Sequence, residues 1–162
     1  MYNLEKKSNI VSAVCVPLFF TMFAVGVLLY LEVSAHAAAP GDLSIPMSKV
    51  SASAGFYPVE IDGVKLEVIA VKAPDGSIRT AFNTCQICFD SGRGYYKQSG
   101  NALVCQNCGS RFAISQIEVV RGGCNPVPIL PENKKIEGGN IVVPREFLVQ
   151  AKEIFANWKT DY

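Results

Sequence analysis

The sequence predicts a small, mainly β, antiparallel domain with two cysteine-bearing turns and one C-terminal α-helix, preceded by an N-terminal transmembrane helix. Three observations predict this fold class. A long apolar run without any charge lies near the N-terminus, short β-prone stretches separated by tight-turn residues fill the middle, and an amphipathic helical pattern closes the chain. The 162 residues suffice for one domain of ordinary size.

The apolar run Ile10–Leu31 predicts a membrane anchor. As a helix it would extend about 33 Å, against a hydrocarbon core of about 30 Å. Lys6 and Lys7 precede it, and such charges keep that end in the cytoplasm, so the rest of the chain is expected in the periplasm or another extracytoplasmic space. Ala35-His36-Ala37 has the form of a signal-peptide cleavage site, so secretion after cleavage at about Ala37 is the alternative.

A tether is expected after the anchor, because the following residues are rich in Ala, Ser, Pro and Gly. Cys15 is interpreted as part of the membrane packing, and His36, the only histidine, as part of the tether. The expected parts are a cytoplasmic N-terminus at 1–9, the membrane segment at 10–31, the tether at 32–55 and a cysteine-rich domain at 56–162.

The first half of that domain has the signals of an antiparallel sheet. Tyr57–Ile61 and Val64–Val71 flank Asp62-Gly63, and this dipeptide is typical of a two-residue hairpin turn. Pro74-Asp75-Gly76 predicts the next turn, before a third strand at Ser77–Phe82. Further short strands are expected at Ala102–Val104 and Ile141–Val143.

The C-terminal stretch Pro144–Trp158 predicts a helix packed on the sheet. Pro144 suits a first helical turn, where its missing N–H costs nothing. The apolar residues that share one helical face are Phe147, Ala151, Ile154, Phe155 and Trp158.

Four cysteines form two C-x2-C turns, Cys85 with Cys88 and Cys105 with Cys108. Each turn directs two thiolates at one centre, and two such turns on neighbouring strands complete a tetrahedral sulfur site. Gly109 follows the second turn and lets backbone N–H groups face the sulfurs. Four thiolates suit an iron–sulfur cluster, zinc or a single iron, and spacing does not separate these.

Disulfides are the competing interpretation, since exported cysteines commonly oxidise. Five cysteines outside the membrane segment leave one thiol over, and a Cys85–Cys88 bridge would close the small ring typical of redox-active pairs. The fifth, Cys124, lies in a glycine- and proline-rich loop, Gly122 to Pro131. It is expected to be a further ligand, a replacement for one of the four, or a lone buried thiol.

Charge and composition exclude several classes of function. The net charge of +1 gives no electrostatic reason to expect nucleic acid. We find no Ser/His/Asp set, no phosphate loop and no recognisable pair of catalytic acids, so hydrolytic chemistry is not expected.

The two cysteine turns resemble rubredoxin knuckles and zinc ribbons, and their setting resembles that of Rieske proteins. Cys105–Phe112 is similar to the second ligand turn of that fold, and Gly122–Pro131 to its proline-rich loop over the cluster. Cys88 and Cys108 stand where Rieske sites carry histidines, and an all-cysteine site should have a lower reduction potential.

A closer resemblance, from about Tyr57 to Ile129, is to the FtrD-like family of membrane iron–sulfur-containing proteins. It implies membrane attachment, an iron–sulfur or related metal centre, and an association with iron-uptake systems. The matching stretches are Val64–Val71, Arg79–Phe82, Cys85–Cys88, Gly94-Tyr95, Cys105–Gly109 and Gly122–Pro126.

Together these features predict a one-electron carrier at the outer face of the membrane, acting with redox or iron-transport proteins of the membrane in iron uptake or respiration. The expected ligands are Cys85, Cys88, Cys105 and Cys108, with Cys124 as a reserve ligand or lid thiol. Tyr95, Tyr96 and Phe112 are expected to shield the centre or to be ordinary core residues. The alternatives are a zinc-stabilised docking module and a thiol–disulfide oxidoreductase that uses Cys105 and Cys108.

Overall fold

A computed structural model describes residues 39–160 of the chain. The predicted membrane segment at 10–31, with Cys15, and the cleavage-like sequence around His36 lie outside these residues. Within residues 39–160, no helix has both the length and the apolar character needed to cross a bilayer.

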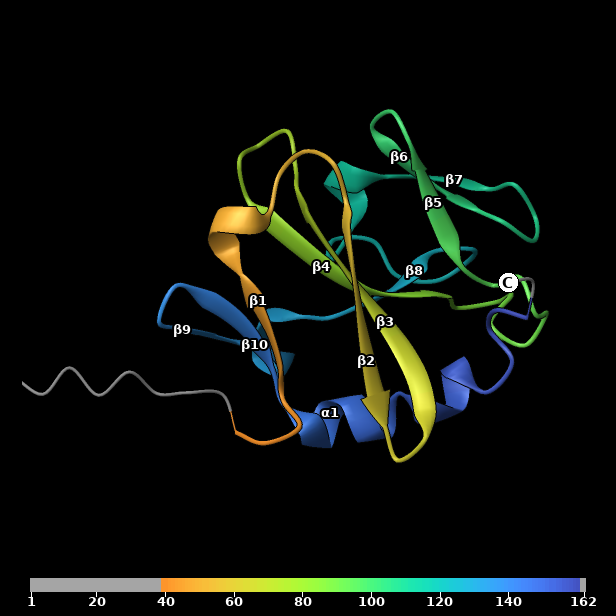
Figure 1. Cartoon of the computed structure of the whole chain (residues 1–162). Helices are drawn as coiled ribbons and strands as arrows, with labels where there is room; N and C mark the ends of the chain where they lie inside the picture. The colour runs from red at the N-terminus through yellow and green to blue at the C-terminus, as the bar shows by residue number, and fades with distance from the viewer. Residues whose placement is uncertain (1–38, 161–162) are drawn as a thin grey trace, which may run out of the picture. The chain divides into compact units, whose positions relative to one another are not determined.

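Three small antiparallel sheets make up most of the described fold, which confirms the mainly β prediction. Figure 1 shows the strands β1, β9 and β10 on one side of the central strands and β5 to β7 on the other. The central sheet has the order β2 (Gly55–Ile61), β3 (Val64–Lys72), β4 (Ile78–Cys85) and β8 (Pro126–Pro128). The second has the order β1 (Leu43–Pro46), β10 (Asn140–Val143) and β9 (Lys135–Glu137), and the third is β5 (Tyr96–Ser99), β6 (Ala102–Cys105) and β7 (Arg111–Ala113).

The predicted hairpin at the start of the central sheet is confirmed. Ile61 of β2 pairs with Val64 of β3, which leaves the two-residue turn Asp62-Gly63 between them. Both turn residues have positive φ, 51° and 81°, the conformation that Asp-Gly adopts at low cost. The next turn also lies where Pro74-Asp75-Gly76 predicts it, between β3 and β4.

The predicted tether is wrong over its described part. Leu43–Pro46 forms β1, which pairs with β10, and Met47–Lys49 forms the short 3₁₀ helix η1. Ile45 is fully buried opposite Ile141. The ordered fold therefore begins before Phe56, because the alternating Leu43 and Ile45 supply a strand that the surrounding Ala, Ser and Pro residues obscure.

The predicted C-terminal helix is shorter than expected. The α-helix α1 covers only Arg145–Gln150, and Pro144 is its N-cap. After Ala151 the chain tightens into the 3₁₀ helix η4 (Lys152–Phe155). Carbonyls that a longer helix would use are bound elsewhere, since the Thr84 hydroxyl donates to Ile154 O at 3.1 Å and Gly92 N–H to Asn157 O at 2.8 Å. The apolar residues of the predicted face still pack into the core.

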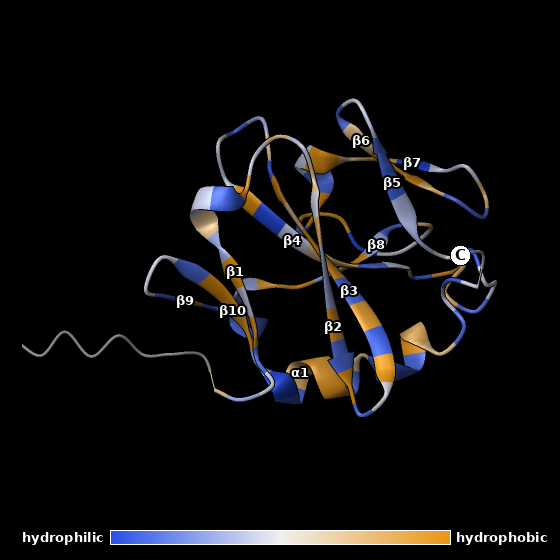
Figure 2. Cartoon of the chain, in the orientation of Figure 1, coloured by the Kyte–Doolittle hydropathy of each residue, from blue (hydrophilic) through white to orange (hydrophobic). Residues whose placement is uncertain are grey.

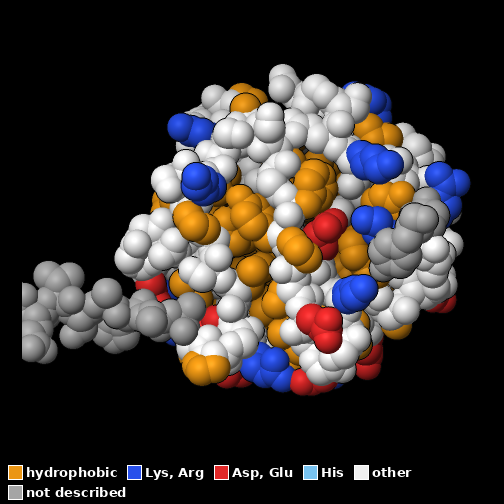
Figure 3. All heavy atoms as spheres, in the orientation of Figure 1, with side chains coloured by type: hydrophobic (Ala, Val, Ile, Leu, Met, Phe, Trp, Pro, Cys, Tyr) orange, Lys and Arg blue, Asp and Glu red, His pale blue; other side chains and the backbone are white. Residues whose placement is uncertain are grey.

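The central sheet separates two apolar cores, and successive residues of β3 face one core and then the other. Val68 and Ala70 belong to the first core, with β1, β10 and α1, whereas Ile69 and Val71 belong to the second, with β6 and β7. Figure 2 shows β3 as largely hydrophobic and β5 as mostly hydrophilic. On the face drawn in Figure 3 both signs of charge occur among apolar side chains, in keeping with the near-zero net charge. The second core is the one that contains cysteines.

Candidate metal centre

The two C-x2-C turns have the same local geometry. In each turn the backbone N–H groups two and three residues after the first cysteine hydrogen-bond to its sulfur, at Cys85 and at Cys105. Such N–H groups stabilise a thiolate and orient it. The arrangement of N–H groups that Gly109 predicts for the second turn is therefore present there, and the first turn has it too.

The first turn follows directly from β4, and a bulge determines where it lies. Phe82 pairs with Val127, but the next paired residue is Cys85, opposite Pro126, so two extra residues of β4 lie between them. Bulges of this kind redirect the strand end next to functional sites. A Cβ at Gly94 would overlap the Cys88 carbonyl. The chain can therefore pass this close to the first turn only with glycine at position 94. Cys85 is fully buried and Cys88 is 8 % exposed.

The second turn connects β6 to β7. Gly109 has φ of 74° and donates its N–H to Cys105 O at 2.9 Å, which closes the turn. Cys105 is buried in the second core, whereas Cys108 is exposed to solvent. The Ser110 hydroxyl lies 3.3 Å from the Cys108 sulfur.

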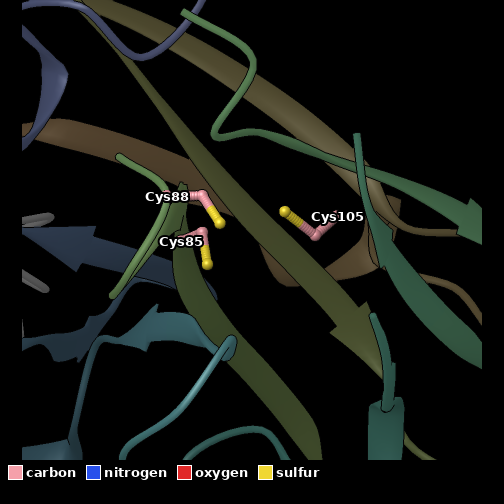
Figure 4. A group of neighbouring side chains, drawn as sticks. All are labelled: Cys85, Cys88 and Cys105. Atoms are coloured by element: carbon pink, nitrogen blue, oxygen red, sulfur yellow. The ribbon is translucent and has the colours of Figure 1, made fainter. Parts of the chain in front are cut away.

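Five thiols gather in two groups that share one member. The sulfurs of Cys85, Cys88 and Cys105 all lie within 4.8 Å of one another, and so do those of Cys88, Cys108 and Cys124. Figure 4 shows the first group, with Cys85 and Cys88 side by side on their turn and the Cys105 sulfur pointing toward them from the opposite side. The two groups are contiguous, because Cys108 lies with Cys88 and Cys124 in the second group and also hydrogen-bonds with Cys105 of the first.

The loop that carries Cys124 is built from two left-handed glycines. Gly122 and Gly123 have φ of 87° and 75°, which residues with a Cβ rarely adopt. The Asn125 N–H donates to Gly123 O at 2.9 Å, so the chain folds tightly around Cys124. The structure places this thiol beside those of Cys88 and Cys108, and its role as a further or replacement ligand stays a prediction.

Of the three aromatic residues expected near the centre, Tyr96 has the most direct contacts. Its hydroxyl donates to Cys124 O at 2.8 Å, and the Cys85 sulfur is a second acceptor for the same proton. Phe112 packs in the same core, whereas Tyr95 lies in the first core against Trp158. Burial raises the pKa of Tyr96 far above its usual value, so it remains a proton donor.

The thiols differ strongly in acidity. Burial raises the pKa of Cys88, and it raises that of Cys105 to about 12. A hydrogen bond with Cys108 and burial raise the pKa of Cys124 to about 12. Burial opposes ionisation of Cys85 too, but hydrogen bonds from Tyr96 and the backbone outweigh it and lower the pKa. Hydrogen bonds from Ser110 lower the pKa of Cys108 to about 6.

Some contributors to this site carry no signal in the sequence. Gln86 bonds to the Cys124 loop, although the identically placed Gln106 of the second turn does not. Asn125 is 8 % exposed, and among the described residues its Nδ2 has no hydrogen-bond partner. The glycines around Cys124 indicate an unusual loop, but not which groups it meets.

Comparison with known families matches residues 50–155 to the FtrD-like family of membrane iron-sulfur containing proteins. Comparisons with curated proteins and with solved structures give no match. The match covers most of the chain, and the chain therefore belongs to the FtrD-like family.

Proposed function

We propose that the protein is a membrane-anchored electron carrier whose five clustered thiols hold an iron–sulfur centre. The observation that carries the proposal is the division of these thiols into two groups joined through Cys88. A single zinc or iron ion needs four sulfurs around one point. A cluster distributes its cysteines over several irons, so a wider set of thiols suits it better.

The surroundings of the thiols also fit such a group. Three of them, Cys85, Cys88 and Cys105, are buried in one core, and burial excludes water from a centre there. The buried amide of Asn125, next to Cys124, has a donor without a partner among the described residues. Sulfide and thiolate sulfurs would supply acceptors for it. We assign Cys85, Cys88, Cys105 and Cys108 as ligands, with Cys124 as the reserve ligand.

When bound, such a centre supplies reversible one-electron transfer. The chain contributes backbone N–H donors to Cys85 and Cys105, and the Tyr96 hydroxyl to Cys85. Donors of this kind stabilise extra negative charge and raise the reduction potential. Exposed Cys108 marks the edge where electrons would pass to a partner. We assign the partner to membrane redox or iron-transport proteins, and the domain to the extracytoplasmic side.

The sequence resemblance of the second cysteine turn and the Cys124 loop to Rieske proteins supports the same proposal. Three antiparallel sheets, two cysteine turns and a glycine- and proline-rich loop carrying Cys124 occur together here. Fold analogy alone does not establish a function, so the electron-transfer assignment depends on the cofactor.

The test is to purify the full chain in detergent without oxygen and to measure iron, acid-labile sulfide and visible absorption before and after dithionite. We expect iron with sulfide, and a visible band that bleaches on reduction. Stoichiometric zinc without colour would overturn the proposal in favour of a structural docking module. Absence of metal with reactive thiols would overturn it in favour of a thiol–disulfide oxidoreductase.

A further inference from the structure

The two cysteine turns carry glutamine at the same position, but the two side chains bind different partners. Both Gln86 and Gln106 follow the first cysteine of their turn, and both are half-buried. Gln106 Nε2 donates to Val104 O at 2.9 Å, two residues back in the strand β6 that precedes it. Gln86 Oε1 instead accepts the N–H of Gly122 at 3.2 Å, 36 residues along the chain.

Gln86 contacts the Cys124 loop on both sides of the cysteine. Its backbone N–H donates to Asn125 O at 2.9 Å, and its Nε2 lies 3.5 Å from Pro126 O. The far end of the loop is also anchored by β8, where Pro126 pairs with Cys85 of β4. The near end depends on the Gln86 side chain.

The stretch before Cys124 has few other anchors. Upstream, Glu118 is fixed by the Thr80 backbone N–H at 2.6 Å and by Lys134 Nζ at 2.5 Å. From Val119 to Gly123, among the residues that the structure describes, the hydrogen bond from Gly122 to Gln86 is the one that reaches another segment. Val119 and Val120 are 63 % and 38 % exposed, Arg121 is exposed, and the two glycines have no side chains, so little side-chain packing holds this stretch.

We propose that Gln86 is a positioning residue that holds the Cys124 loop against the first cysteine turn and so keeps the fifth thiol beside Cys88 and Cys108. Its assignment to an iron–sulfur site rests on the proposed function, whereas the contact itself does not. Loss of the side chain frees the near end of the loop. Cys124 then leaves the group for part of the time and becomes accessible.

The experiment compares the alkylation rate of each cysteine by iodoacetamide, read by peptide mass spectrometry on the purified full chain in detergent. For Gln86→Ala we expect Cys124 to react about fivefold faster or more, since loss of one ordinary hydrogen bond changes the population of an open loop by about that factor. Gln106→Ala is the matched control and leaves the Cys124 rate unchanged. Equal Cys124 rates in the two variants would overturn the proposal.

Rescue and a second readout separate positioning from a general loss of structure. Gln86→Glu keeps an oxygen that accepts the Gly122 N–H, so its Cys124 rate should stay near that of the unchanged protein. In the unchanged protein, the Gly122 amide should exchange hydrogen more slowly than the Gly123 amide. Fast exchange at Gly122 would contradict the proposal even if Gln86→Ala failed to fold.

The same preparations separate this inference from the proposed function. Iron and sulfide content tests the cofactor, whereas the alkylation contrast between Gln86→Ala and Gln106→Ala is read on whichever form the protein takes. If iron and sulfide are absent but the contrast persists, the cofactor assignment fails and the positioning role stands. If iron and sulfide are present but the two variants show the same Cys124 rate, the positioning role fails and the cofactor assignment stands.

Discussion

The two cores on opposite faces of the central sheet are stabilised in different ways. The first is built from aliphatic and aromatic residues, with Phe82, Phe155 and Trp158 in edge-to-face contacts. The second contains Cys85, Cys88 and Cys105 among its buried members. Hydrophobic burial and packing stabilise the first core without any cofactor. Thiolates repel one another, so if the proposed centre is bound, the second core is expected to draw part of its stability from the cation that neutralises them.

The strand β3 contributes to both cores, and this shows where the two kinds of stability meet. Its alternate residues Ile69 and Val71 face the thiol-containing core, while Val68 and Ala70 face the apolar one. A mutation that disrupts the packing of one core can therefore leave the contacts of β3 in the other core intact. Mutations should therefore separate a metal-dependent loss of stability from a metal-independent one.

The largest effect is expected for Cys105→Ser. Serine binds soft metals poorly and leaves a hydroxyl at a position that is 1 % exposed. We expect loss of metal and a fall in the free energy of unfolding of more than about 5 kcal/mol, since structural metals contribute about 10–16 kcal/mol in small domains. Metal analysis and denaturant unfolding check this. Cys15→Ser, outside the described residues, is the control, and full retention of metal and stability in Cys105→Ser would refute the ligand assignment.

A smaller and cofactor-independent effect is expected for Leu148→Ala in the first core. Leu148 is fully buried on α1, so its truncation leaves a cavity and should cost about 2–5 kcal/mol. The metal content per folded chain should not change. Val149→Ala, on the same helix but 37 % exposed, should have little effect on unfolding. A parallel loss of metal in Leu148→Ala would show that the two cores are not separable.

Local patterns predicted much of the first half of the domain. The hairpin between β2 and β3 depends on Asp62-Gly63, whose positive φ is a property of those two residues. The C-terminal helix depends on tertiary contacts instead. Thr84 binds the Ile154 carbonyl, and no helical periodicity reports a partner 70 residues away. For the same reason the composition of the tether concealed β1, whose pairing with β10 is long-range.

The site shows the same division. C-x2-C spacing identified Cys85, Cys88, Cys105 and Cys108, because two thiols in one turn are a local feature. The grouping of Cys108 with Cys124 rather than with Cys85 depends on how three separate segments pack. Gln86 and Gln106 have the same local sequence setting, so only the fold distinguishes them.

Tyr96→Phe should affect the thiol-containing core modestly. The change leaves the Cys124 carbonyl without the hydroxyl that now binds it at 2.8 Å, which should cost about 1 kcal/mol of unfolding free energy. It also removes a hydrogen bond that lowers the pKa of Cys85, so that pKa should rise. Unfolding and Cys85 alkylation against pH measure both effects. Tyr95→Phe, in the other core, should leave the Cys85 profile unchanged; an equal shift would contradict the assigned contact.

The smallest effect concerns the exposed edge of the second core and does not alter stability. The Ser110 side chain and backbone lower the pKa of Cys108 to about 6, while burial raises that of Cys105 to about 12. In reduced, chelator-treated protein, Cys108 alkylation should therefore be half-maximal near pH 6 and decline below it, with Cys105 unreactive at neutral pH.

Ser110→Ala should move the Cys108 midpoint upward, because the group that stabilises the thiolate most is removed. An unchanged midpoint would exclude the serine as the cause. The difference in pKa between Cys108 and the buried thiols also predicts which thiol binds an incoming metal ion first. Above about pH 6 Cys108 meets a cation as a thiolate, whereas the buried thiols must release protons to bind it. Metal affinity should then rise with pH because the buried thiols lose their protons more readily at higher pH. Cys108, already a thiolate above about pH 6, should contribute little to that dependence.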